Sequence, residues 1–590
     1  MTDSDTPAPS NVLRTAPNRT HAWARAMIDE CVRSGTSMFF ISPGSRSTPL
    51  TTAVAQHPKA RAILHLDERG GAFAAIGYAR VTGRPAGWIT TSGTAVANGM
   101  PAVVEAAQEG IPLLLLTADR PPERRNTGAN QTIDQVKLFG DHVCWSADVP
   151  PPDAEVPLAS VLTTVDQALH HAQRPPGGPV HLNVMYRKPL HPVEQEAYEI
   201  TDPAVEAWSQ RRTPFTTYPV PVPHATVPET LIDAVQQAER GLIVAGRLSD
   251  ADAKELLEWA QAQHWPVLPD ITSQLRLAAD SPVVPYAHHI IQDAPNPEAL
   301  HPDVILQVGG RFVSKPMRHL IRDANASVHA TLRPAPLRVD PDHRCTHHIE
   351  TTIEAAIDAL PTRTATPASW NGQWQRYNEA VESAFDAPPE GMPAVHEPGI
   401  AWAISEHIPD THAWMLASSM PIRDAQRYAV ASGPAVPVVA NRGASGIDGT
   451  LATAAGISAA RNAPTTLLIG DLATWHDVNA LALLQAHPVI AVVINNDGGG
   501  IFHFLPIAQH DDVFDPYFTT PQGRSFDAIA DAFDLPYARP TTLSEFTHAY
   551  QNACDRGTSA LIEVGTDRST NADVHHQLDA HVAQALAEAA

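Results

Sequence analysis

Cysteine is scarce in this chain, and no part of it is apolar enough to cross a membrane. Its four cysteines, among 590 residues, are scattered and form no Cys-x-x-Cys pair, which argues against a disulfide framework. No apolar run approaches the ~20 residues that a membrane-spanning helix needs. The N-terminus lacks the basic start and apolar core of a signal peptide. We therefore expect a cytoplasmic protein with reduced thiols and no integral membrane segment.

Lysine is also scarce, and positive charge is outweighed by negative charge. Only five of the 40 basic residues are lysines, and 64 acidic residues give a formal net charge of -24. Such a surface cannot neutralise a run of phosphates, which excludes nonspecific nucleic-acid binding. The preference for arginine is typical both of a GC-rich genome and of adaptation to salt, and the sequence does not separate these explanations.

The length and the order of predicted elements indicate several α/β domains. A chain of 590 residues exceeds one hydrophobic core, and 43% hydrophobic residues is typical of globular proteins. Strand and helix patterns alternate throughout, which predicts doubly wound parallel sheets. Proline-rich segments around 213–229 and 388–398 indicate linkers. We predict a first domain at 1–190, a linker at 191–230, a central domain at 231–361, a second linker at 362–398 and a third domain at 399–590.

A β-α-β pattern between Thr465 and Leu505 carries the clearest sign of chemistry. Two apolar runs end in Gly470-Asp471 and in Asn495-Asn496, and a leucine-rich segment with helical spacing joins them. Parallel strands bring their carboxyl ends to one sheet edge, so Asp471 and Asn496 can converge. With the carbonyl of Gly498 they would suit Mg²⁺ on a diphosphate. Ordinary turn chemistry is the alternative, and the spacing alone does not decide between them.

Polar residues also follow strands of the first domain. Ser45 and Arg46 lie in a glycine turn that could hold an anion, although a plain βα turn is the simpler interpretation. Glu68 starts a helix and is either a functional carboxylate or a helix cap. A loop rich in planar donors follows a buried strand and suits either carboxylate recognition or an ordinary surface. That loop contains Asp119, Arg120, Arg124, Arg125, Asn130 and Gln131.

We interpret two groups of histidines as structural rather than as metal sites. His343, Cys345, His347 and His348 could bind zinc, but their spacing matches no finger or catalytic zinc pattern, so we interpret them as a polar loop. Histidines also cluster in the predicted final helix, 575–590, where we expect a solvated face.

Several stretches of the chain, taken together, resemble one enzyme family. The resemblance is to the MenD-type 2-succinyl-5-enolpyruvyl-6-hydroxy-3-cyclohexene-1-carboxylate synthases, thiamin-diphosphate enzymes of menaquinone biosynthesis. It runs through all three predicted domains, and Leu472, where the wider superfamily has glycine, accords with this family. It implies pyrimidine-binding, central and diphosphate-binding domains. The stretches are ISPGSRSTPLT, LDERGGAF, TSGTAVAN, LLTADRPPE, GANQ, NRGASGIDG, GDLATWHDVNAL and NNDGGGIFHFLP.

The resemblance implies a transketolase-type transferase reaction (EC 2.2.1.9). 2-Oxoglutarate would be decarboxylated on thiamin diphosphate, and the succinyl-semialdehyde carbanion would add to isochorismate. Glu68 would hydrogen-bond the aminopyrimidine ring, and Ile447 would bend the cofactor. The residues implied for the cofactor and its Mg²⁺ or Mn²⁺ are Glu68, Ile447, Gly470, Asp471, Asn496, Gly498, Ile501 and Phe502.

Both substrates are dicarboxylates, and the resemblance assigns cations to each. Isochorismate would meet Ser45, Arg46, Arg120, Asn130, Gln131 and Lys315. The 2-oxoglutarate side would meet Ser419, Arg423 and Arg442, although the family often has Asn-Ser where this chain has Ser418-Ser419. Ile501, Phe502 and Leu505 would exclude water from the cavity.

The family's architecture also implies a homodimer or a dimer of dimers, with Glu68 and Asp471 of one site on different chains. The alternatives are another thiamin-diphosphate-dependent 2-oxoacid decarboxylase or carboligase, and a non-catalytic α/β protein.

Overall fold

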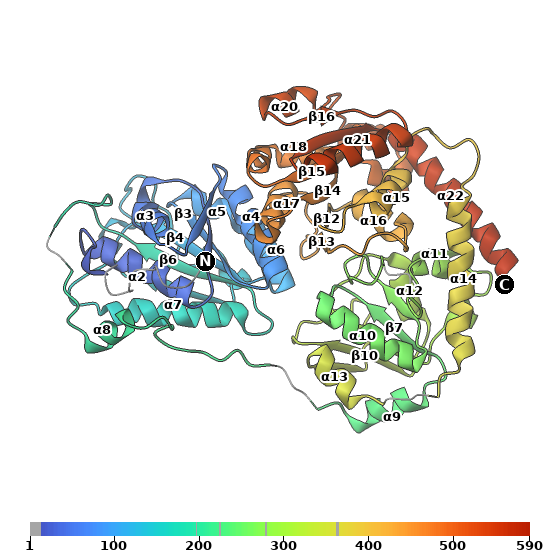
Figure 1. Cartoon of the computed structure of the whole chain (residues 1–590), viewed down its shortest axis with the longest axis horizontal. Coiled ribbons are helices and arrows are strands. Elements are labelled where there is room, and N and C mark those ends of the chain that lie inside the picture. The colour runs from blue at the N-terminus through green and yellow to red at the C-terminus, as the bar shows by residue number, and fades with distance from the viewer. Residues whose placement is uncertain (1–12, 196–197, 223–225, 278–279, 362–364) are drawn as a thin grey trace. The chain divides into compact units, whose positions relative to one another are not determined.

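The structure contains three parallel sheets of six, five and six strands, each accompanied by helices (Figure 1). It is a computed structural model that describes residues 13–195, 198–222, 226–277, 280–361 and 365–590. The predicted fold class is confirmed. Contacts divide the chain into two units. Unit 1 comprises Met1–Pro221, Gly443–Asn462 and Asp477–Leu484, and unit 2 comprises Val222–Arg442, Ala463–His476 and Gln485–Ala590.

Unit 1 is built on a six-stranded sheet in the order β2-β1-β3-β4-β6-β5. The central strand β4 is buried along its whole length, as expected for a parallel strand covered on both faces. The strands are β1 (Met38–Ile41), β2 (Arg61–Leu64), β3 (Ala86–Thr90), β4 (Leu113–Asp119), β5 (Trp145–Val149) and β6 (Pro179–Met185). The helices are α2 (Arg19–Arg33), α3 (Thr48–Gln56), α4 (Glu68–Thr82), α5 (Thr94–Asn98), α6 (Met100–Glu109), α7 (Leu158–Gln173), α8 (Pro203–Ser209) and α17 (Thr450–Arg461).

Helices α4 and α17 cross at very close range. A Cβ atom built on Gly77 of α4 would lie 2.1 Å from the carbonyl oxygen of Thr453, and one on Gly456 of α17 would lie 2.0 Å from that of Ala74. The two backbones can approach this closely only because both positions lack a side chain. This crossing fixes the segment of residues 443–449, which precedes α17, against the start of α4.

The first sheet of unit 2 has the order β11-β10-β9-β7-β8. Its strands are β7 (Gly241–Ala245), β8 (Val267–Pro269), β9 (Val304–Val308), β10 (Val328–Arg333) and β11 (His347–Glu350). The helices of this part are α9 (Glu229–Gln237), α10 (Asp250–Gln263), α11 (Ala287–Asp293), α12 (Lys315–Asp323), α13 (Ile353–Ala359) and α14 (Ala368–Asp386). Helix α14 lies inside the second predicted linker, and the predicted domain bounds stay a prediction.

The second sheet of unit 2 has the order β13-β12-β14-β15-β17-β16. Its strands are β12 (Ala413–Leu416), β13 (Val438–Ala440), β14 (Thr465–Gly470), β15 (Val489–Asn495), β16 (Tyr537–Ala538) and β17 (Ala560–Gly565). Its helices are α15 (Glu397–His407), α16 (Met420–Tyr428), α18 (Asp471–His476), α19 (Asp511–Phe514), α20 (Asp527–Ala532), α21 (Leu543–Arg556) and α22 (Arg568–Ala589).

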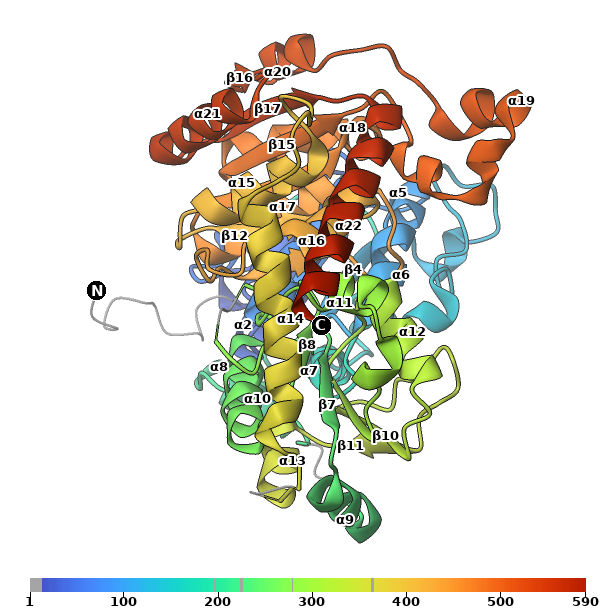
Figure 2. The ribbon, with the colours of Figure 1, turned by 90° about the vertical axis from the view of Figure 1, so that its right-hand side faces the viewer.

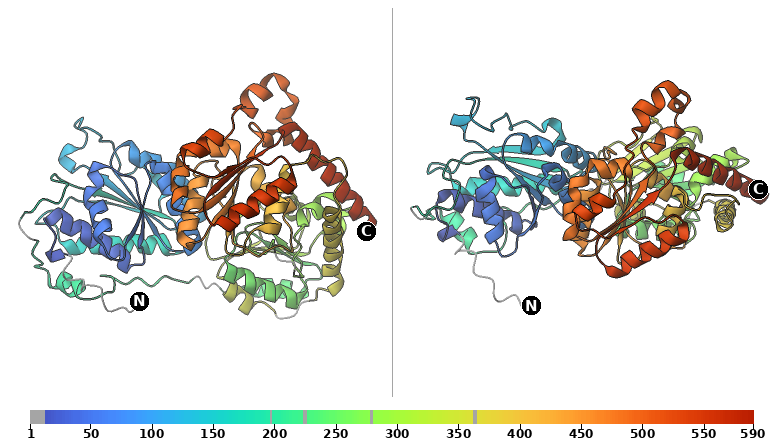
Figure 3. Two further views of the ribbon diagram at one scale, coloured as in Figure 1. Left: turned by 45° about the horizontal axis from the view of Figure 1, so that its top comes forward. Right: turned by 90° about the horizontal axis from the view of Figure 1, so that it is seen from above.

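The long helices α14 and α22 run side by side and share an aromatic core (Figure 2). Trp370, Trp374 and Phe385 of α14 belong to the same buried cluster as Leu578 and Val582 of α22. Helix α22 ends at Ala589, and the C-terminus of the chain lies at its end (Figure 3). No helix among the described residues is both long and apolar enough to span a membrane.

Three local expectations change in detail. The leucine-rich segment after α18 forms a 3₁₀ helix, η5 (Val478–Gln485), rather than one α-helix. His575 of α22 is buried and pairs with Asp424 at 2.8 Å, so the expectation of a wholly solvated face was wrong. His347 and His348, which we expected in a polar loop, are the first two residues of strand β11. The Cys345 thiol, just before the strand, donates to the carbonyl of His347.

Candidate functional site

The β-α-β pattern folds as predicted, with β14 and β15 parallel and Gly470 aligned with Ile494. Asp471 directly follows β14, and Asn496 directly follows β15. The Asp471 carboxylate accepts hydrogen bonds from the backbone N–H of Gly498 at 2.8 Å and of Leu472 at 2.7 Å. The strand ends therefore bring Asp471 and the loop after Asn496 together at one sheet edge.

Asn496 is held in one orientation by a residue that the sequence analysis missed. Its amide nitrogen donates to Glu397 at 2.8 Å, and the Thr566 hydroxyl donates to the same carboxylate oxygen at 3.1 Å. Its amide oxygen is buried and has no hydrogen-bond partner among the described residues. A buried acceptor of this kind calls for a donor or a cation. An amide oxygen beside a carboxylate is a donor set that Mg²⁺ or Mn²⁺ accepts.

Gly498 has a backbone that only glycine adopts without strain. Its φ is +124°, and a Cβ atom there would lie 1.8 Å from the carbonyl oxygen of Thr519. Its own carbonyl accepts from the N–H of Gly500 at 2.7 Å and keeps a second lone pair. Burial raises the pKa of Asp471 to about 6, so a bound cation would favour its ionised form.

The apolar residues predicted to wall the cavity follow this loop. Ile501 and Phe502 lie in the 3₁₀ helix η6 (Gly500–Phe504) and are half-buried. Phe502 packs edge-on against Phe518, with 5.5 Å between ring centroids. Leu505 follows η6 and is 45% exposed. These side chains present an apolar surface next to the Asn496 loop.

Glu68 lies at the first turn of α4, but it is not the helix cap. The cap is Asp67, whose carboxylate accepts from the N–H of Arg69 at 2.9 Å. Glu68 instead accepts a hydrogen bond from the Asn98 amide at 2.9 Å. Asp67 rather than Glu68 therefore caps the helix, and the carboxylate of Glu68 contacts Asn98 instead of the helix backbone.

Ile447 belongs to the segment 443–449, which is anchored within unit 1. Glu105 of α6 is buried and accepts from the N–H groups of Gly443 at 3.0 Å and Ala444 at 2.6 Å. At its other end, a Cβ atom on Gly449 would lie 1.9 Å from the ring of Phe73 in α4. The segment is thus packed on α4, and Ile447 remains 38% exposed.

A cavity of about 600 Å³ in unit 1 collects the five residues of this unit that were predicted to bind isochorismate. Their fixed contacts orient them. Arg46 donates to the carbonyl of Tyr186 at 2.8 Å, Arg120 donates to the Ser92 hydroxyl, and the Gln131 amide donates to the Ser92 carbonyl at 2.8 Å. The lining includes Ser45, Arg46, Arg120, Asn130 and Gln131, and also Arg124 of the loop that was predicted to suit carboxylate recognition. Glu123, Arg187 and Lys188 line it too, and sequence reasoning did not assign them.

The cavity has an excess of positive charge. Burial and then the charge of Arg120 lower the pKa of Arg46, and burial lowers that of Arg120. Of the cations in the lining, Arg187 is paired with Glu123 at 2.8 Å. The charges of Arg46 and Arg120 repel each other, and an anion bound between them would offset this repulsion. The cavity therefore suits an anionic ligand.

A buried polar network supports the loop that carries Arg120. Asp119 is fully buried at the end of β4 and accepts from Arg125 at 2.8 Å and from the Asn183 amide at 3.0 Å. Gln135 links Asn183 to the N–H of Gly93, with both hydrogen bonds at 2.9 Å. Arg125 was one of the candidate carboxylate binders. It forms ion pairs with Asp119 and Asp148 and stabilises the fold of this unit instead.

The remaining predicted substrate residues lie in unit 2. Ser419 precedes α16 with φ +75° and ψ -132°, a strained backbone for a residue other than glycine. Its carbonyl accepts from Arg423, whose pKa is lowered by burial and then by the charge of Arg442. The two arginines thus lie within electrostatic reach of each other. Lys315 is exposed at the first turn of α12.

Comparisons with known proteins agree over almost the whole chain. Residues 22–138 match the thiamine pyrophosphate enzyme N-terminal TPP binding domain, residues 201–416 the middle domain, and residues 421–564 the C-terminal TPP binding domain. The chain is 54% identical to 2-succinyl-5-enolpyruvyl-6-hydroxy-3-cyclohexene-1-carboxylate synthase of Salinibacter ruber, over 97% of this chain and 98% of the relative.

Synthases of the same name from Rubrobacter xylanophilus and Chlorobaculum parvum are 48% and 40% identical, each over 95% of this chain and over 98% and 97% of the relative. The chain therefore belongs to the 2-succinyl-5-enolpyruvyl-6-hydroxy-3-cyclohexene-1-carboxylate synthase family of thiamin-diphosphate enzymes.

Proposed function

We propose that this protein decarboxylates 2-oxoglutarate and joins the remaining four-carbon unit to isochorismate, giving 2-succinyl-5-enolpyruvyl-6-hydroxy-3-cyclohexene-1-carboxylate and CO₂ in menaquinone biosynthesis (EC 2.2.1.9). The observation that carries the proposal is the cationic cavity of unit 1, which collects Ser45, Arg46, Arg120, Asn130 and Gln131. A decarboxylase with a small neutral acceptor would not need this concentration of fixed cations.

At the diphosphate end, Asp471 and Asn496 would hold Mg²⁺ or Mn²⁺, with the carbonyl of Gly498 as a third ligand. The buried, unpartnered amide oxygen of Asn496 supports this assignment. When bound, thiamin diphosphate supplies the electron sink that lets a 2-oxoacid lose CO₂. The protein's part is to fix the diphosphate through the metal and to keep the site closed to water.

At the other end, Glu68 would donate or accept the proton at the aminopyrimidine ring nitrogen. Helix α4 is capped by Asp67, so the Glu68 carboxylate is not needed as a cap, which supports this role. Ile447 would bend the bound cofactor, since it is an exposed apolar residue on an anchored segment. Arg423 and Arg442 would bind the carboxylates of the 2-oxoglutarate side, while Ser419 and Lys315 would contribute polar contacts.

Ile501, Phe502 and Leu505 would exclude water that could otherwise protonate the reacting carbon. The half-buried side chains of Ile501 and Phe502 and the exposed side chain of Leu505 follow the Asn496 loop, which supports this role.

We further propose a cytoplasmic homodimer, or a dimer of such dimers, in which each site uses both chains. Leu64 and Leu66 of unit 1 are 64% and 71% exposed, and they lie four and two residues before Glu68. Large apolar side chains at this exposure are typical of surfaces that a partner covers. A second copy of this chain would cover them in the proposed assembly.

One assay tests the reaction. Purified protein with thiamin diphosphate, Mg²⁺, 2-oxoglutarate and isochorismate should form a product with the mass of the carboligation adduct, and CO₂ release should depend on isochorismate. Equal CO₂ release with and without isochorismate, and no adduct, would indicate a simple 2-oxoacid decarboxylase instead.

A further inference from the structure

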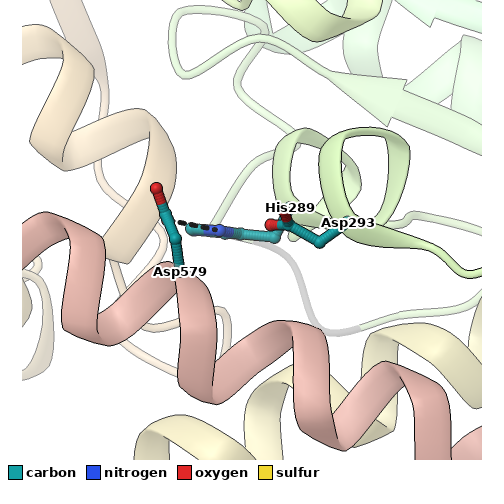
Figure 4. A group of neighbouring side chains, drawn as sticks. All are labelled: His289, Asp293 and Asp579. Carbon is teal, nitrogen blue, oxygen red and sulfur yellow. Dashed lines mark ion pairs between the residues drawn. The ribbon is translucent and has the colours of Figure 1, made fainter.

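A histidine and two aspartates meet where α11 contacts α22 in unit 2 (Figure 4). His289 and Asp293 are four residues apart on α11 and so share one helix face. Asp579 reaches them from α22. One ligand atom from each side chain can be chosen so that all three lie within 4.8 Å of one another. Among the residues that the structure describes, this is the one such group of potential metal ligands.

His289 has an unused lone pair on Nδ1, on the side of the ring that faces Asp579. Its ring is fully buried, and Nε2 lies 3.2 Å from the carbonyl oxygen of Arg427, a contact that requires Nε2 to carry the proton. Burial, Arg427 and His288 hold the pKa of His289 well below its ordinary value, so the ring is neutral. Nδ1 is therefore unprotonated, and it has no hydrogen-bond partner. It lies 3.7 Å from an oxygen of Asp579.

The group is also short of positive charge. Arg427 contacts the same oxygen of Asp579 that lies 3.7 Å from His289 Nδ1, so a metal ion would bind this carboxylate through its other oxygen. Asp293 accepts from the Gln292 amide at 3.3 Å on each oxygen, and the charge of Arg427 affects its pKa less than burial and Asp579 do. Burial and then the charge of Asp579 raise its pKa to about 6. Arg427 is thus one cation for two carboxylates and the lone pair of His289, and a metal ion among these three side chains would offset the remaining repulsion.

We propose that His289, Asp293 and Asp579 bind a divalent transition-metal ion of the Zn²⁺ class, which joins α11 to the C-terminal helix α22. One imidazole with two carboxylates suits Zn²⁺ and its neighbours better than Mg²⁺ or Ca²⁺, which prefer oxygen ligands alone. Zinc takes such ligands at ~2.0–2.2 Å, so the half-buried aspartates would close in on the buried imidazole. Water would complete the coordination. The site is separate from the Asp471 and Asn496 pair.

The test uses the full-length protein saturated with thiamin diphosphate and Mg²⁺, so that the cofactor's own metal position is filled. Titration with Co²⁺ should give visible absorption from one further ion per chain, and Zn²⁺ should displace it. Zn²⁺ should also raise the midpoint of thermal unfolding. In Asp293→Asn and His289→Phe, affinity should fall ~10-fold or more, because even the loss of an outer partner of a metal ligand has that effect.

Asp323→Asn on α12 removes an exposed carboxylate elsewhere and is the matched control. If His289→Phe does not fold, the conservative Asp293→Asn carries the test. No uptake beyond the cofactor's metal would overturn the proposal, and so would uptake that survives both variants. Uptake abolished by Asp471→Asn would place the ion at the cofactor and would equally overturn it.

Discussion

Asn496 depends on Glu397 for the direction of its amide group. Without the hydrogen bond from its nitrogen to Glu397, the amide could rotate and turn its nitrogen toward the metal position. We expect Glu397→Ala to weaken Mg²⁺ binding ~10–100-fold, as is typical when a partner that orients a metal ligand is lost. Calorimetric titration of Mg²⁺ in the presence of thiamin diphosphate measures this. Thr566→Val removes only the second donor to Glu397 and should have a smaller effect. An unchanged affinity in Glu397→Ala would contradict the orienting role.

Variants of Glu68 and of its neighbour Asp67 should separate an effect on catalysis from an effect on folding. Glu68→Gln should leave α4 intact, because Asp67 caps it, and should slow exchange of the cofactor's C2 proton by ~10²-fold or more, within the usual contribution of a positioned acid or base. NMR-detected hydrogen exchange measures this rate. Asp67→Asn keeps a good capping residue and should leave exchange nearly unchanged. Normal exchange in Glu68→Gln would remove Glu68 from its proposed role.

Arg120 and Arg423 should discriminate between the two substrates. Arg120 lines the cavity proposed for isochorismate, whereas Arg423 lies near Arg442 at the position proposed for 2-oxoglutarate. Each change to Ala should raise KM ~10-fold or more for its own substrate, since a hydrogen bond to a charged group contributes ~1.5–3 kcal/mol. Steady-state kinetics with each substrate varied in turn gives the comparison. Equal effects on both KM values would reject the assignment.

Among the elements, strand ends were predictable and side-chain partners were not. The convergence of Asp471 with the loop after Asn496 follows from two short apolar runs and the geometry of a parallel crossover, which are local signals. Glu397 lies 99 residues before Asn496 in the chain, so no local pattern could pair them. The choice of Asp67 over Glu68 as cap depends on side-chain direction. Likewise, the ion pairs of Arg125 with Asp119 and Asp148 depend on the folded arrangement of the chain, so the sequence alone did not predict them.

The first turn of helix α17 donates a hydrogen bond to a buried carboxylate, that of Asp477. This carboxylate should make the stability of unit 1 depend on pH. Asp477 accepts from the N–H of Ala452 at 3.0 Å, and burial raises its pKa from 3.8 to about 7. The folded chain thus binds this proton more tightly than the unfolded chain does. The stabilisation is complete below about pH 4 and is lost as the pH rises to about 7.

Asp477→Asn keeps an oxygen acceptor but cannot ionise. Its free energy of unfolding should therefore rise relative to the wild type, by up to about 1.4 kcal/mol for each pH unit between pH 4 and 7. Urea denaturation across this range measures the difference. The exposed Asp512→Asn serves as the control and should show a constant offset. A constant offset for Asp477→Asn as well would show that Asp477 titrates normally.

For the whole molecule, the proposed assembly makes each active site a joint product of two chains. The exposed Leu64 and Leu66 support a covering partner, and in the proposed assembly that partner supplies the diphosphate end. Glu68 and Asp471 of one site would then come from different subunits, and a monomer would be inactive. The expectation is testable because each residue can be disabled separately.

Glu68→Gln subunits and Asp471→Ala subunits, each inactive alone, would be unfolded, mixed in equal amounts and refolded. A mixed dimer would contain one site with both defects and one site with neither. Random pairing should therefore restore roughly a quarter of wild-type activity if the sites act independently. Native mass spectrometry of the mixture verifies that mixed dimers form. If both residues came from one chain, every site would keep one defect, so mixed dimers no more active than their parents would reject the shared site.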